Sequence, residues 1–170
     1  MFSGFVSTGS TAIRVLVLTT DGSLTPTNST AVPTYRVYGP TGIMANGTGS
    51  TSFAETGTIT NATNATPIVI TSAAHGLSTG TRVTITGVGG NTAANATWVI
   101  TKIDANSFSL QTSVGNGAYT SGGTWNTTGL YKVDITPLTA DGYVADTLYT
   151  VFFSYVVSVS KSQMKSFACV

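Results

Sequence analysis

The chain has 170 residues, of which 41% are hydrophobic and only 8% are charged, and its net charge is +1. This length and apolar content suffice for one large domain or two small ones with a hydrophobic core. The near-neutral surface has no basic patch to neutralise phosphates, which argues against nucleic-acid binding. Low charge also favours self-association, because little repels a neighbouring copy.

Apolar residues alternate with polar ones along much of the chain, a period of two that is typical of strands. In residues 12–19, Ile13, Val15 and Val17 share one face, whereas Leu16 and Leu18 share the other face with Arg14. A strand that is apolar on both faces belongs inside a sandwich or at an assembly interface. Further strands are predicted over 34–38, 50–55, 67–71, 82–87, 97–103 and 107–111, with a hairpin loop at 104–106.

The C-terminal part continues this pattern. Over 130–136, Tyr131, Val133 and Ile135 face away from Lys132 and Asp134, which we expect to form a surface pair. The last two strands are predicted over 148–159 and 163–169. Turn signals recur at Asp21-Gly22, Asn46-Gly47, Gly89-Gly90, Gly122-Gly123 and Asp141-Gly142. Many short strands without a helical period predict an all-β sandwich or barrel.

Composition divides the chain into two parts. Residues 57–126 are dominated by Thr, Asn, Gly and Ala, whereas the flanks, 1–56 and 127–170, hold most of the aromatic residues. Inserting a domain into a loop is geometrically inexpensive when its two ends lie close together. We therefore predict one sandwich made from both flanks, interrupted by a second β unit over 57–126, with 58–66 as a leading linker of strand character.

No set of residues in the sequence supports catalysis. His75 is the only histidine and lies in a glycine-punctuated loop, so we expect its ring to bond a backbone group. The loop Gly87–Asn91 lacks the lysine and the following helix of a phosphate loop and is predicted to connect two strands. Asp21, Asp104 and Asp141 lie in turn contexts. We predict neither an enzyme nor a cofactor.

The sequence also gives little indication of a metal site, a disulfide bond or a membrane-spanning segment. Asp141 and Asp146 could share a calcium ion, but no alternating Asp/Asn run accompanies them. The single cysteine, Cys169, can form neither an internal disulfide nor a zinc site and is expected to be chemically idle. The N-terminus has no signal-peptide pattern, and the most apolar stretch, 149–159, is too short and too rich in serine to span a membrane.

Trp98, Tyr119 and Trp125 have two interpretations. Their rings could form a platform on which sugars stack. Aromatic residues in small β modules more often fill the core, and we prefer that interpretation.

The most distinctive segment of the sequence runs from residue 66 to residue 125. Its ordered motifs are Pro67-Ile68-Val69-Ile70-Thr71, His75-Gly76-Leu77-Ser78-Thr79-Gly80, Val83-Thr84-Ile85-Thr86-Gly87-Val88, Asn91-Thr92-Ala93-Ala94-Asn95, Trp98-Val99-Ile100, Ile103-Asp104-Ala105-Asn106-Ser107-Phe108-Ser109-Leu110 and Gly117-Ala118-Tyr119-Thr120-Ser121-Gly122-Gly123-Thr124-Trp125. This segment resembles a small β-barrel module found in structural proteins of tailed bacteriophages, often labelled after the first catalytic-cysteine half-domain of ubiquitin-activating enzymes. The flanks loosely resemble the immunoglobulin-like sandwiches of phage virion proteins, without the cysteine pair that is usual in antibody domains.

The resemblance implies an immunoglobulin-like β-sandwich with an inserted small β-barrel module, located in the virion. It implies a capsid decoration or cement protein, or alternatively a head-to-tail connector, a tail or a fibre component. Its partners would be the major capsid protein or neck and tail proteins, and it would form a homo-oligomer. An alternative of another class is a carbohydrate-binding or adhesion module.

The sequence also suggests which residues hold the assembly together. With so few charges, the contacts are expected to be apolar and to come from the flanking sandwich. The residues predicted for this role are Phe2, Phe5, Leu16, Leu18 and Phe152. Residues 1–10 are rich in Gly and Ser around two phenylalanines, which suits an arm that orders only against a neighbour.

Overall fold

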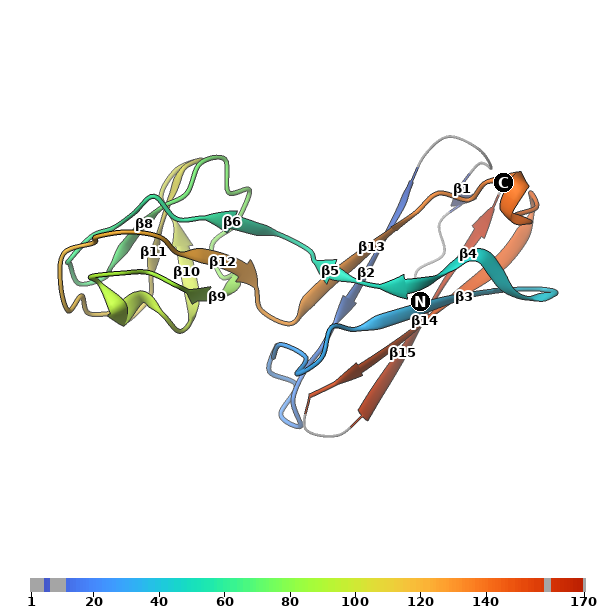
Figure 1. Cartoon of the computed structure of the whole chain (residues 1–170), viewed down its shortest axis with the longest axis horizontal. Helices are drawn as coiled ribbons and strands as arrows, with labels where there is room; N and C mark the ends of the chain where they lie inside the picture. Colours follow the sequence, from blue (N-terminus) through green and yellow to red (C-terminus); the bar gives the residue numbers. More distant parts are fainter. Residues whose placement is uncertain (1–4, 7–11, 158–159, 170) are drawn as a thin grey trace. The chain divides into compact units, whose positions relative to one another are not determined.

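The structure, a computed structural model, describes residues 5–6, 12–157 and 160–169, with side chains described over 12–157. Within these residues, regular structure consists of strands and of two 3-10 turns, η1 (Thr92–Ala94) and η2 (Thr139–Asp141) (Figure 1). The prediction of an all-β chain is thereby confirmed.

The chain divides into two compact units. Unit 1 comprises Met1–Ser52 and Gly129–Val170, and unit 2 comprises Phe53–Thr128 between these two segments. The boundaries expected from composition, 57 and 126, lie slightly inside those of unit 2.

The larger sheet of unit 1 combines both flanks of the chain. Its five strands run in the order β1-β15-β14-β3-β4. Their bounds are β1 (Phe5–Val6), β15 (Ser160–Cys169), β14 (Thr147–Val156), β3 (Thr34–Gly39) and β4 (Gly42–Ser50). All pairs are antiparallel except β1 with β15, in which Phe5 pairs with Ala168. The prediction that the N-terminal arm orders only against a neighbour is therefore wrong for Phe5–Val6, whose backbone pairs with the edge of β15 in its own chain.

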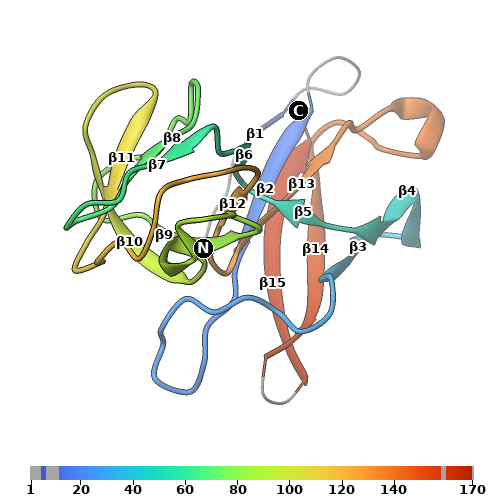
Figure 2. The same cartoon turned by 60° about the vertical axis from the view of Figure 1, so that its left-hand side comes forward.

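A smaller sheet forms the second layer of unit 1. It has the order β2-β13-β5, with β2 (Ile13–Leu18), β13 (Leu130–Ile135) and β5 (Ser52–Phe53) (Figure 2). The boundary between the units falls within β5, because Ser52 belongs to unit 1 and Phe53 to unit 2. Along β13 the residues alternate as predicted, because Tyr131, Val133 and Ile135 are buried whereas Asp134 is exposed. Alternate residues of both sheets supply the buried side chains of unit 1, including Val17, Val37, Tyr131, Val133, Ile135, Tyr149, Val151, Phe153 and Tyr155.

Strand β4 was not predicted. Asn46-Gly47 reads as a turn signal, yet both residues lie inside this nine-residue strand. The pairing of β3 with β4 shifts register between Arg36 and Tyr38, a bulge that accommodates the irregular segment. A Cβ at Gly47 would lie 3.0 Å from the Cβ atoms of Met44 and Val37. Glycine is therefore needed here because the backbone passes close to these side chains, and not because the chain turns.

Unit 2 is a seven-strand sheet that surrounds its own core. The strand order is β6-β12-β9-β10-β11-β8-β7. The bounds are β6 (Thr56–Thr58), β12 (Thr124–Thr127), β9 (Arg82–Thr86), β10 (Thr97–Lys102), β11 (Ser107–Leu110), β8 (Val69–Thr71) and β7 (Asn61–Ala62). The core contains Ile59, Ala62, Ile68, Ile70, Leu77, Val83, Ile85, Val88, Ala94, Ile100, Phe108, Leu110 and Trp125. Each of the larger aliphatic side chains fully buried there stabilises the fold by roughly 1.5–3 kcal/mol.

Candidate assembly surfaces

His75 is a structural residue of unit 2, as predicted. Its ring is only 4% exposed and packs edge-on against Phe108, with ring centroids 5.1 Å apart. The Leu77 N–H donates to Nδ1 over 3.0 Å, and Nε2 lies 3.0 Å from the carbonyl oxygen of Asp104. Since Nδ1 accepts a hydrogen bond, Nε2 carries the proton and donates one, so each ring nitrogen is bonded to a backbone group.

The other residues considered for catalysis lie in connections between strands. Residues 87–91 belong to the connection between the paired strands β9 and β10, as predicted. The carboxylate of Asp104 accepts the Asn106 N–H over 2.7 Å within the β10–β11 hairpin, and this hydrogen bond is the main reason that its pKa is lowered. Asp21 accepts the N–H groups of Ser23 and Thr25 in a turn, also as predicted.

The calcium hypothesis for Asp141 and Asp146 has no geometric support. Asp141 accepts a hydrogen bond from the side chain of Asn46 over 2.8 Å, which ties η2 to β4. Asp146 lies in the following loop at φ 55°. Within the part of the chain that the structure describes, no three His, Cys, Asp or Glu side chains gather in a way that could hold a metal ion.

The preferred interpretation, that the aromatic residues of unit 2 fill its core, is confirmed for Trp125, and the alternative of a sugar-stacking platform is wrong for this residue. Trp125 is 2% exposed, packs edge-on against Phe108 and donates from Nε1 to the Ser72 hydroxyl over 2.8 Å. It is a core residue and presents no face to a sugar. Trp98 and Tyr119 are half-buried against the same core, and they hydrogen-bond to the carbonyl oxygens of Ala94 and of Ile59 and Gly122.

Exposed large apolar side chains concentrate in unit 1. Among the described side chains, the nine in unit 1 are Leu16, Leu18, Leu24, Val32, Tyr38, Ile43, Leu138, Val144 and Leu148, whereas the two in unit 2 are Ile103 and Val114. Single exposed apolar residues are ordinary, but neighbouring ones on one sheet face are typical of interaction surfaces. The sheets of unit 1 are therefore the candidate assembly surfaces.

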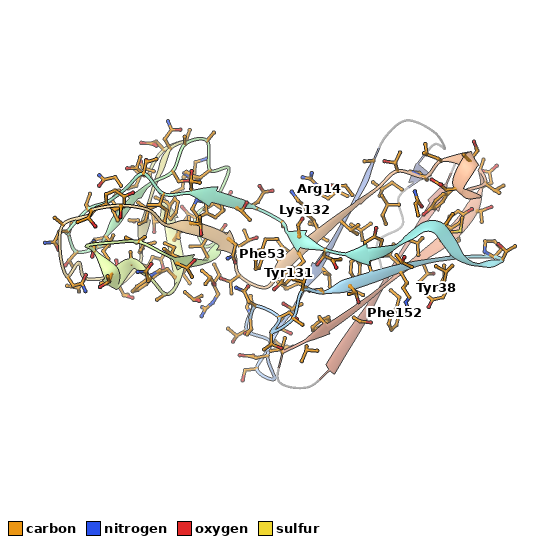
Figure 3. The ribbon with its side chains drawn as sticks, viewed as in Figure 1. Arg14, Tyr38, Phe53, Tyr131, Lys132 and Phe152 are labelled. Carbon is orange, nitrogen blue, oxygen red and sulfur yellow. The ribbon has the colours of Figure 1, made fainter. Side chains whose placement is uncertain are left out.

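One such surface, which we call the β2–β13 outer face, consists of Arg14, Leu16, Leu18, Leu130, Lys132 and Asp134. The register pairs Leu18 with Leu130, Leu16 with Lys132, and Arg14 with Asp134. Leu16 and Leu18 are 43% and 42% exposed, as expected for a strand that is apolar on both faces. Figure 3 shows Arg14 and Lys132 on this side of unit 1.

A cross-strand ion pair lies at one end of this face. Arg14 Nε donates to Asp134 Oδ1 over 2.8 Å, and Nη2 donates to Oδ2 over 3.3 Å. The hydrogen bond from Arg14 is the main cause that lowers the pKa of Asp134, and the charge of Lys132 acts in the same direction. The predicted pair of Asp134 with Lys132 is thus corrected, because the residue directly opposite on the neighbouring strand reaches the carboxylate better than one two positions along the same strand.

The second surface, the β3–β14 outer face, consists of Arg36, Tyr38, Ile43, Leu148 and Phe152. Tyr38 pairs in register with Ile43 on β4 and with Thr150 on β14, and Phe152 pairs with Arg36. Leu148 is 62% exposed, Ile43 49% and Tyr38 37%, while Phe152 is half-buried. Figure 3 shows Tyr38 and Phe152 together on the side of unit 1 formed by β3 and β14.

The five residues predicted for assembly have different outcomes. Leu16, Leu18 and Phe152 lie on the two outer faces just defined. Phe2 lies outside the described residues, and the side chain of Phe5 lies outside the described side chains. The same holds for the side chain of Cys169, which was predicted to be chemically idle. Tyr38, Ile43 and Leu148 were not predicted, and no local signal marks them because only the register of three strands brings them together.

A scan against protein-family models and a search among curated proteins found no match for the chain. Neither of the two helical turns in the described part of the chain has the length or apolar character needed to cross a membrane.

Proposed function

We propose that the chain is a structural component of a tailed-phage virion, most plainly a capsid decoration or cement protein, and that unit 1 holds it in the particle. The observation that carries this proposal is the uneven distribution of exposed apolar residues, nine in unit 1 against two in unit 2 among the described side chains. A particle component gains stability when neighbours cover such residues, at roughly 25 cal/mol per Å² of apolar area.

The fold assignment belongs to the same proposal. We assign unit 1 to the immunoglobulin-like sandwiches and unit 2 to the small β-barrel module whose motifs run from 66 to 125. Two layers with alternating burial support the first assignment, and a curved sheet around a single core supports the second. In this proposal unit 1 contacts the particle and unit 2 is displayed on it.

The β3–β14 outer face suits binding that does not depend on charge. The described residues of the β3–β14 outer face include one charged side chain, Arg36, and the β2–β13 outer face already pairs its Arg14 with Asp134. Exposed ion pairs contribute only about 0–1 kcal/mol each, so apolar contact supplies most of the binding free energy. We expect attachment to particles to survive molar salt.

Quantitative mass spectrometry of gradient-purified particles of the phage that encodes the chain tests this function. A copy number that matches the shell lattice identifies a decoration protein, and one that matches a single symmetric ring identifies a connector or tail component. Absence from the particles, together with glycan binding by the purified chain, would instead establish the adhesion alternative, with Trp98 and Tyr119 as the remaining aromatic candidates.

A further inference from the structure

The β2–β13 outer face carries an ordered pattern across its two strands. Its three rows are Arg14 opposite Asp134, Leu16 opposite Lys132, and Leu18 opposite Leu130. One end is therefore charged with both signs side by side, and the other end is aliphatic. The side chains of Arg14 and Asp134 remain 53% and 39% exposed, so both stay accessible although they contact each other.

We propose that this face binds the same face of a second copy of the chain, with a twofold axis that runs parallel to the strands midway between the two sheets. Rotation about this axis places β2 of each copy over β13 of the other. Every residue then meets the counterpart of its own cross-strand partner. Arg14 of one copy lies over Asp134 of the second copy, and Leu18 lies over Leu130 of the second copy.

Charge complementarity selects this arrangement. The two ion pairs combine into a ring of four alternating charges, in which each charged group has an opposite charge beside it and another across the interface. At the other end the four leucines of the last row form an aliphatic cluster. Leu16 meets the methylene stem of Lys132 of the second copy, which can cover it while the ammonium group stays in water.

The other face-to-face twofold arrangement does not fit. An axis perpendicular to the strands reverses their direction, so it places the Arg14–Asp134 pair over the Leu18–Leu130 pair of the second copy. That contact would take the Arg14–Asp134 pair out of water against aliphatic side chains, and it would add no partner beyond the one that each charge already has, which is costly. The strand-parallel axis is therefore the one for which the surface is complementary to itself.

The size of the face sets the expected affinity. Stable interfaces bury about 800 Å² per partner, and a face two to three strands wide offers less. The contact is therefore weak and depends on concentration in solution, and it gains strength in a particle where other contacts hold the copies close together. It deepens the proposed assembly function by naming a second copy as one partner, but it is tested on the purified chain alone, so either proposal can fail without the other.

Charge-reversed variants test the geometry. Sedimentation velocity of the wild-type chain from micromolar to millimolar concentration should show the average mass rise from monomer toward dimer. Arg14→Asp and Asp134→Arg should each weaken self-association by about tenfold or more, because each places like charges opposite one another across the interface. Mixing these two variants should restore association as a heterodimer, because the two acidic side chains of one face the two arginines of the other. Native mass spectrometry distinguishes the heterodimer by mass.

Matched apolar variants cover the case in which a charge reversal prevents folding. Leu18→Asp should abolish association, whereas Val114→Asp, at a residue of unit 2 that is 63% exposed, should leave it unchanged. A wild-type chain that stays monomeric at every concentration would overturn the proposal. So would a mixture of the two charge variants that forms no heterodimer while both are folded by circular dichroism, or a Leu18→Asp chain that associates as strongly as the wild type.

Discussion

Units 1 and 2 use similar strands in opposite ways. Unit 2 directs its apolar residues inward, onto a core that includes Phe108 and Trp125, and it fixes its loops with polar side chains such as His75. Unit 1 also has a buried core, but it leaves leucines and aromatic residues on the outer faces of both sheets. The comparison shows that unit 2 buries most of its large apolar side chains in its own core, whereas unit 1 exposes several that a neighbouring molecule can cover.

The difference follows from the residues that the strands contain. In β9, buried Val83 and Ile85 alternate with Thr84 and Thr86, and the Thr84 hydroxyl lies 3.1 Å from that of Thr97 and 2.9 Å from that of Thr128. A threonine face of this kind is polar and its hydroxyls satisfy one another. The outer residues of β2 include two leucines, whose side chains form no hydrogen bonds, so only burial removes them from water.

The largest expected effect tests whether unit 2 is stable by itself. Trp125→Ala removes the largest fully buried side chain and leaves the Ser72 hydroxyl without its indole donor. We expect unit 2 to lose about 3–5 kcal/mol of unfolding free energy. Hydrogen exchange followed by mass spectrometry should show lost protection over 53–128 and unchanged protection over 129–156. Equal loss in both regions would contradict the comparison, and Ile103→Ala, at an exposed position, serves as the control.

A smaller effect is expected at His75. His75→Ala leaves the Leu77 N–H without its acceptor and removes the edge-on contact with Phe108, which should cost about 2 kcal/mol. His75→Asn keeps an acceptor close to the position of Nδ1 and should recover part of the loss, although it cannot reach the Asp104 carbonyl. Urea unfolding measures the three unfolding free energies, which should decrease from the wild type to His75→Asn and then to His75→Ala. If alanine and asparagine prove equal, the hydrogen bond to Leu77 is not what holds this loop.

Alternation sufficed to predict most strands because burial on one face leaves a period of two in the sequence. Over 130–136 and 82–87 the buried positions agree with this pattern. Strand β4 escaped prediction because Gly42, Gly47 and Gly49 carry no side chains to alternate. Its existence depends on pairing with β3 and on a close approach to Val37, neither of which is local.

The candidate surfaces were predictable only where one strand carried the signal by itself. Leu16 and Leu18 stood out because β2 is apolar on both faces. The Arg14–Asp134 pair joins residues 120 positions apart, and the cluster of Tyr38, Ile43 and Leu148 requires the order of β4, β3 and β14. The register between strands far apart in sequence is set by the tertiary structure, so it cannot be predicted from a local sequence pattern.

Within unit 1, the loop before β3 connects both layers through Ser29 and Tyr131. The Ser29 N–H donates to the Tyr131 hydroxyl over 3.0 Å, and the Ser29 hydroxyl donates to the Val156 carbonyl oxygen over 2.9 Å. Tyr131→Phe should therefore cost about 1 kcal/mol of stability, measured by urea unfolding at neutral pH. Tyr38→Phe, on the β3–β14 outer face, makes the same chemical change at an exposed position and serves as the control, for which we expect no measurable effect.

The same substitution changes the response to alkali. Burial raises the pKa of Tyr131 above its usual value of 10.0. A raised pKa means that the stability contributed by the protonated phenol is fully present below about pH 10 and is lost as the pH rises through the folded-state pKa. The wild-type chain should therefore lose stability in that range to a greater extent than Tyr131→Phe. Parallel alkaline profiles for the two chains would contradict this account of the buried phenol.

The smallest effect on stability is expected at Asp134, where the comparison between folding and assembly is sharpest. Asp134→Asn should cost only about 0–1 kcal/mol of unfolding free energy, because the pair with Arg14 is exposed and screened by water. The lowered pKa of Asp134 determines how the stability that this ion pair contributes changes with pH. This contribution is present above the usual carboxyl value of 3.8 and is lost as the pH falls through the lower folded-state pKa, so wild type and variant should become equally stable in acid. Self-association at neutral pH should fall more than stability does, since the ring of four charges loses two members. Thermal unfolding and sedimentation velocity on the same samples separate the two effects, and a variant that unfolds more easily yet associates normally would place Asp134 in the fold of unit 1 and not in its interface.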